Sequence, residues 1–135
     1  MSRKRILICF IDNGDIKHTV AKNIMLDKIE KELKEEGREL IERYYDLKSF
    51  KLAFKDSSTI QSVPFSHLSK SILTLGEKFA FTHVYIDDAV KDMFEGTPFM
   101  SKFVESLLVN NDSRFDTSGK RVNFYSLKDS NLEIN

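Results

Sequence analysis

The 135-residue chain has one cysteine, no tryptophan, no excess of either charge and no long apolar run. Because the single cysteine is Cys9, one chain offers neither a disulfide framework nor a multi-cysteine zinc site, and we expect a reducing, intracellular compartment. The apolar run behind the basic start MSRKR lasts only from Ile6 to Ile11. This run is too short for a signal peptide or a membrane-spanning helix. We therefore expect a soluble, cytoplasmic or nuclear protein without a membrane partner.

The charges balance, with 21 basic and 21 acidic residues giving a formal net charge of zero. Such a balance does not indicate a nucleic-acid partner, although it does not exclude one. The length fits a single domain over residues 1–135. The chain contains eleven phenylalanines, which we expect mainly to fill the core.

Apolar periodicity predicts strands alternating with amphipathic helices. Period-two or continuous apolar patterns indicate strands at 4–11, 39–46, 82–87 and 121–127, and helical spacing indicates helices at 16–36, 64–79, 88–95 and 97–108. Residues 50–54 fit a short edge strand or a helical turn, and residues 56–63 fit a loop. Helical crossovers join parallel strands. The predicted fold is therefore a three-layer α/β domain: a mostly parallel, open sheet of about four to five strands with helices on both faces.

Acidic residues follow the first and third predicted strands. Asp12 ends the stretch ILICFID and Asp87 ends THVYID. If these strands are neighbours, the two carboxylates lie close together, and their repulsion favours a cation such as Mg²⁺. Asp15 and Asp88 stand close enough in sequence to join them as metal ligands, and Ser126 at the end of the last strand is a candidate phosphate contact. The alternative is that these acids only cap helices.

Short segments resemble two families. ILICFIDN, HVYIDDAVKDMFEG and NFYSL are similar to receiver domains of two-component signalling. That resemblance implies a magnesium ligand at Asp12, a phosphate acceptor at Asp87 and a hydroxyl contact at Ser126. FIDNGD, a helix and ERYYD resemble the opening of NYN/PIN-type ribonuclease domains. There the implied role of Asp12 is to join other acids around a metal.

Two functions of different classes remain open. The first is a regulatory or assembly module that binds a protein partner or a second copy through an edge strip of Phe50, Leu52 and Phe54. The second is a magnesium-dependent phosphoryl-transfer or nuclease domain built on the strand-end acids. The carboxyl ends of the strands lack a convincingly placed lysine or arginine, which favours the first.

Two further observations leave alternatives open. His18 is either a proton-transfer partner near Asp15 or a solvated residue at the start of a helix. Tyr44 and Tyr45 carry rings that can stack on bases, although no basic run surrounds them in the sequence.

Overall fold

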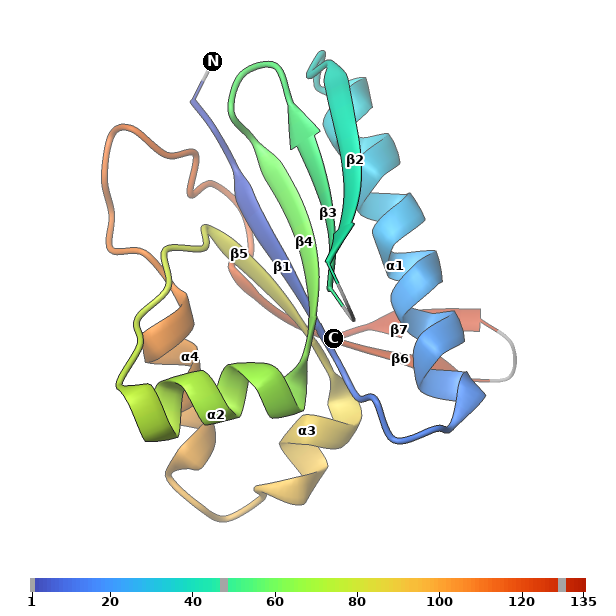
Figure 1. Cartoon of the computed structure of the whole chain (residues 1–135), viewed down its shortest axis with the longest axis vertical. Coiled ribbons are helices and arrows are strands. Elements are labelled where there is room, and N and C mark those ends of the chain that lie inside the picture. The colour runs from blue at the N-terminus through green and yellow to red at the C-terminus, as the bar shows by residue number, and fades with distance from the viewer. Residues whose placement is uncertain (1, 47–48, 129–130) are drawn as a thin grey trace.

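The computed structural model describes residues 2–46, 49–128 and 131–135 and contains seven strands and four helices within them. Figure 1 shows how these elements are arranged. In chain order they are β1 (Arg5–Phe10), α1 (Ile16–Glu35), β2 (Leu40–Asp46), β3 (Ser49–Phe54), β4 (Thr59–Pro64), α2 (Phe65–Leu75), β5 (His83–Asp87), α3 (Asp88–Met93), α4 (Phe99–Leu107), β6 (Val122–Lys128) and β7 (Asn131–Ile134).

All seven strands form one mixed sheet in the order β2-β3-β4-β1-β5-β6-β7. The inner pairs β4–β1, β1–β5 and β5–β6 are parallel, whereas β2–β3, β3–β4 and β6–β7 are antiparallel. The predicted α/β class is confirmed. The predicted sheet of four to five mostly parallel strands is wrong, because antiparallel strands extend both sides of the parallel centre.

Strand β1 is almost continuously apolar because both of its faces are covered. Ile6 and Ile8 pack against α1, whereas Leu7 and Cys9 belong to the core under α2, α3 and α4. These side chains are at most 4% exposed. The predicted three layers follow from this arrangement, since helices cover opposite faces of the sheet (Figure 1).

Residues 59–64, within or beside the predicted loop, form strand β4 beside β1. Strand β4 separates β1 from β3 and β2, so the second predicted strand is not the neighbour of the first. Strand β1, which Asp12 follows, and strand β5, which Asp87 ends, are parallel neighbours. The loop prediction failed because polar Ser58, Thr59, Gln61 and Ser62 obscure the two apolar residues that point to opposite faces, Ile60 and Val63.

The predicted edge strip of Phe50, Leu52 and Phe54 lies on an inner strand. Strand β3 pairs with β2 on one side and β4 on the other. Leu52 is 0% exposed and Phe54 is 2% exposed, and both pack in the core under α1. The prediction of an exposed edge strip is therefore wrong, because β2 pairs with the side of β3 that was predicted to be open.

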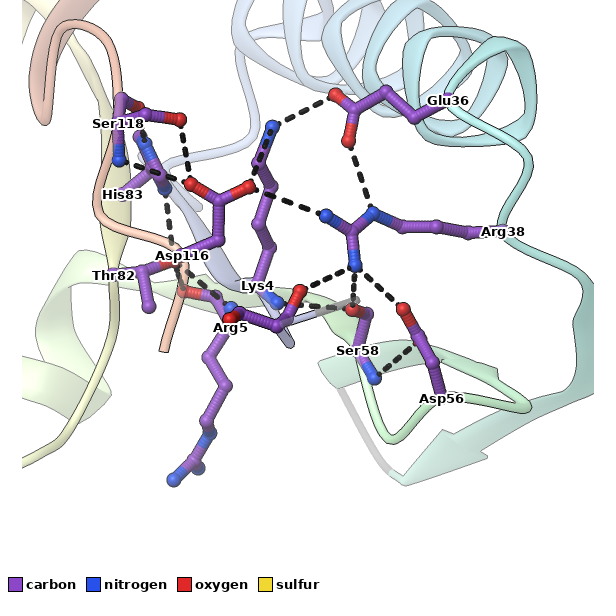
Figure 2. A network of polar contacts seen from close by, with 11 residues as sticks. Lys4, Arg5, Glu36, Arg38, Asp56, Ser58, Thr82, His83, Asp116 and Ser118 are labelled. Carbon is purple, nitrogen blue, oxygen red and sulfur yellow. Dashed lines mark hydrogen bonds and ion pairs between the residues drawn. The ribbon is translucent and has the colours of Figure 1, made fainter. Parts of the chain in front are cut away.

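The amino-terminal end of the parallel strands is closed by a polar network around Arg38 (Figure 2). The Arg38 side chain is only 1% exposed and forms ion pairs with Glu36, Asp56 and Asp116. It also donates to the backbone oxygen of Ser2 and to Ser58 Oγ. These contacts join the segment after α1 to the β3–β4 turn and to the segment that precedes β6.

No helix in the described part of the chain is both long enough and apolar enough to cross a membrane.

Candidate functional site

Strand β1 marks the point at which successive connections change sides of the sheet. After β1 the chain enters α1 on one face, whereas after β4 and β5 it enters α2 and α3 on the other. Open α/β sheets bind ligands in the crevice at such a point, outside the carboxyl ends of the strands. The candidate site therefore lies at the lower end of β1 in Figure 1.

The acidic turn after β1 starts helix α1. The Asn13 side chain accepts a hydrogen bond from the backbone N–H of Asp15, and Asp15 accepts one from the N–H of Lys17. Asp15 is thus the N-cap of α1. Gly14 has φ +85°, a conformation that favours glycine. The carboxylate at residue 15 therefore satisfies the helix terminus itself.

Asp87, at the end of β5, is 3% exposed and holds two elements together. Its Oδ1 accepts a hydrogen bond from the backbone N–H of Ala89 at 3.0 Å and so caps α3. Its Oδ2 lies 2.7 Å from His18 Nδ1 on α1. An Nδ1–H that donates to a carboxylate leaves Nε2 as an acceptor, the arrangement of a general-base histidine.

Two buried groups adjoin this carboxylate. The hydroxyl of Tyr125, which faces Asp87 across the β5–β6 register, donates to the backbone oxygen of Cys9 at 3.1 Å. Burial, and secondarily the negative charge of Asp87, raises the pKa of Tyr125 and that of the Cys9 thiol. Both groups stay protonated at neutral pH, so Cys9 is a buried residue that lacks the thiolate character of a nucleophile.

On the β4 side of β1 lies a pocket of about 500 Å³ between the first half of α1 and the sheet. This volume falls within the range of roughly 300–1,000 Å³ that is usual for small-ligand sites. Helix α1 contributes Lys22, Asn23 and Asp27 to its wall. The strands and the turn after β1 contribute Phe10, Asp12, Arg43, Tyr45, Phe50 and Ser62.

The pocket wall contains two cationic side chains, Lys22 and Arg43, and three aromatic rings. Lys22 Nζ lies 4.5 Å from the centre of the Phe10 ring. Burial lowers the pKa of Lys22, and the nearby Asp12 carboxylate opposes that shift. Arg43 Nη2 lies 2.6 Å from Glu30 Oε2. The rings of Tyr45 and Phe50 have centroids 4.5 Å apart at an interplanar angle of 38°.

Ser62 lies in the pocket wall with an unused hydroxyl. The residue is 1% exposed, and its Oγ has no hydrogen-bond partner in the described part of the chain. Ser62 continues the stripe of β4 that faces α1, two residues after the buried Ile60. Leaving a buried hydroxyl unpaired costs about 1–3 kcal/mol, so a ligand that bonds to Ser62 recovers this energy.

The structure separates the four acids predicted as metal ligands into different roles. Asp15 and Asp87 cap helices, and Asp88 is the first residue of α3. The Asp12 carboxylate interacts electrostatically with Lys22. Among residues 2–46, 49–128 and 131–135, no three histidine, cysteine, aspartate or glutamate side chains are grouped to hold an ion. Both oxygens of Asp87 have protein partners, namely His18 Nδ1 and the backbone N–H of Ala89, and the predicted magnesium site stays a prediction.

Ser126 lies apart from Asp87. The register places Asp87 opposite Tyr125, which faces α1, so the next side chain along β6 points to the other face. Ser126 Oγ is buried and has no hydrogen-bond partner in the described residues. The predicted contact of Ser126 with phosphate stays a prediction. The Ser126 side chain lies on the face of the sheet opposite to Asp87.

Sequence reasoning missed most of the pocket. Lys22, Arg43 and Ser62 come from three separate elements, and only the unpredicted strand β4 brings Ser62 beside β1. Tyr45 is a pocket residue for which the sequence indicated a role, because its ring can stack on a base. Two basic residues line the pocket with Tyr45: Lys22 comes from α1, and Arg43 precedes Tyr45 by two residues in β2. For His18, the partner is Asp87 and not the neighbouring Asp15.

No known protein-family model, curated protein or solved structure matches this chain.

Proposed function

We propose that this protein is a small regulatory module that binds a small molecule in the pocket at the carboxyl end of β1. The observation that carries this proposal is the unpaired, buried hydroxyl of Ser62 in the pocket wall. A binding site commonly combines apolar rings with a few polar groups that lack partners until the ligand arrives. A protein partner or a second copy of the chain would then bind the ligand-bound form and not the free form. This is the regulatory function expected from the sequence.

A thermal-shift screen of a small-metabolite library tests this proposal. A ligand that binds only the folded state raises the melting temperature. The variant Asn23→Trp places a large ring at the pocket wall from an exposed position on α1 and is expected to abolish the shift. The matched control Lys28→Trp lies on the exposed part of the same helix, away from this pocket, and is expected to keep it. The absence of any stabilising compound, or equal responses of both variants, contradicts the proposal.

The regulatory part of the proposal has its own measurement. Light scattering after size-exclusion chromatography, with and without a compound from the screen, reports the oligomeric state. A change in mass, or capture of a defined partner only in the bound state, supports regulation. A chain that stays monomeric and captures no partner in both states contradicts it and leaves a ligand-binding protein without an assembly role.

A second candidate is phosphoryl transfer or nuclease chemistry, and the observation in its favour is the His18–Asp87 pair. A histidine held by a buried carboxylate can accept a proton from water or a hydroxyl. This candidate was expected to need magnesium, so a thermal melt with millimolar Mg²⁺ tests it. Stabilisation of the wild type that is lost in Asp12→Asn and Asp87→Asn supports an ion site. An unchanged melting temperature contradicts the metal-dependent form.

A further inference from the structure

We infer that the pocket takes a nucleoside, an uncharged compound in which a heteroaromatic base is joined to a sugar. This inference rests on the proposed function, because it names the ligand class of the same pocket. Three properties of the wall lead to it: its rings, its charge balance and its unpaired polar group.

The rings of the pocket suit a flat aromatic ligand. Tyr45 is 80% exposed and lies against Phe50 at the pocket wall. An exposed tyrosine held by a second ring offers a stacking face with little loss of side-chain entropy on binding. Stacking of a base on an aromatic side chain contributes about 1–3 kcal/mol and tolerates any base.

The pocket wall has equal numbers of positive and negative side chains, which argues against a phosphate group as the ligand. Lys22 and Arg43 provide two positive charges, whereas Asp12 and Asp27 provide two negative charges. The wall therefore has no excess of positive charge for a triphosphate. The nearby start of α1 adds no anion site, since the Asp15 carboxylate already accepts the backbone N–H of Lys17.

The polar groups of the pocket suit the edges of a nucleoside. Lys22 and Arg43 only donate hydrogen bonds, and the carbonyl oxygens and unprotonated ring nitrogens of a base accept them. The carboxylates of Asp12 and Asp27 accept, as the hydroxyls of a ribose or an exocyclic amino group require. The Ser62 hydroxyl can donate or accept, so it suits either edge.

Isothermal titration calorimetry of the whole protein tests the ligand class. The probes are adenosine, guanosine, cytidine and uridine, with ATP, ribose and glucose as comparisons. We expect at least one nucleoside to bind, ATP to bind more weakly than adenosine, and the free sugars not to bind. Tighter binding of ATP or of a sugar overturns the nucleoside class while the pocket keeps its proposed role.

Two variants locate the binding. Tyr45→Ala is expected to weaken nucleoside binding by about 5- to 150-fold, which corresponds to the loss of one stacked base. Tyr44→Ala is the matched control, because Tyr44 points to the other face of β2, contacts Lys51 and is absent from the pocket wall. Equal affinities of the two variants overturn the inference, since the base then binds elsewhere.

Ser62→Ala gives a second, independent readout. Removing the hydroxyl is expected to weaken nucleoside binding by about 2- to 13-fold, as for one lost hydrogen bond. The melting temperature of the unliganded protein is expected not to fall, because this hydroxyl has no partner to lose. Unchanged affinity overturns the contact with Ser62. If neither a nucleoside nor any compound of the metabolite library binds, the ligand class and the proposed function fail together.

Discussion

At the scale of the residue, Arg38 is a buried cation with several polar partners. Its guanidinium is almost completely buried and lies among three carboxylates (Figure 2). Arginine presents several donors in a fixed plane, which suits such a cluster. Burial alone would raise the pKa of Asp56, yet the hydrogen bonds from Ser58 and Arg38 hold that pKa below its usual value. The network thus prefers its charged form.

We predict that Arg38→Met lowers the free energy of unfolding by about 2–4 kcal/mol. Removing one member of a buried ion pair costs about 3–5 kcal/mol, and water that reaches the partly exposed carboxylates reduces this cost. Urea denaturation at pH 7 measures it. Arg114→Met is the matched control, because the Arg114 side chain is 73% exposed in its pair with Asp112, and exposed pairs contribute little. Equal losses in the two variants would contradict the prediction.

His83 gives the fold a dependence on pH. It is 6% exposed and its Nε2–H donates to the backbone oxygen of Ser118 at 2.7 Å. Burial lowers the pKa of His83, with the hydrogen bond to Ser118 acting in the opposite direction. Lys4 and Arg121 lower the pKa further, whereas Asp116 raises it. The folded state therefore favours the neutral ring.

Acidification is expected to reduce stability through this histidine. Below the usual pKa of about 6.5 the unfolded chain binds a proton that the folded chain resists, so the loss begins there and continues down to the lowered pKa of the folded state. Denaturation midpoints between pH 7.5 and about pH 5 measure the loss. His83→Gln is expected to flatten this dependence, whereas His67→Gln, at an exposed position of α2, is expected to retain it. Identical profiles of wild type and His83→Gln would disprove the assignment.

At the scale of the element, the start of α1 separates the two interpretations of the acidic turn. If Asp15 is only a cap, Asp15→Ala lowers the free energy of unfolding by about 0.5–2 kcal/mol, because one backbone N–H loses its acceptor. This loss is expected to be the same with and without millimolar Mg²⁺. Paired urea titrations measure both. A loss that grows when magnesium is present would show that Asp15 contributes to an ion site.

The sequence predicted best those elements whose apolar residues all face the same core. Helix α1 was predicted at 16–36 and extends over Ile16–Glu35, since its apolar stripe faces a single core. Strand β4 was missed because its residues serve three purposes: Ile60 and Val63 enter different cores, and Ser62 lines the pocket. A polar residue at a buried position weakens the local pattern, and that same residue marks the candidate site.

At the scale of the whole molecule, the two ends of the parallel strands are stabilised differently. The amino-terminal end is joined by the Arg38 network, in which many polar groups have partners (Figure 2). The carboxyl end contains the pocket, the unpaired Ser62 hydroxyl and the His18–Asp87 pair. The two ends therefore differ in their polar groups: Arg38 has several partners at the amino-terminal end, whereas the Ser62 hydroxyl at the carboxyl end has none among the described residues.

The sheet order predicts which backbone amides exchange most slowly with solvent. Strand β1 pairs with β4 and β5 and lies under both cores, so its amides between residues 7 and 9 open only when the whole domain unfolds. Strand β7 pairs only with β6, and most of its side chains are exposed. Hydrogen exchange followed by nuclear magnetic resonance is expected to give β1 amides the free energy of global unfolding and β7 amides a smaller one. Equal protection in β1 and β7 would mean that the edge strand unfolds only with the centre, which contradicts the predicted order of opening.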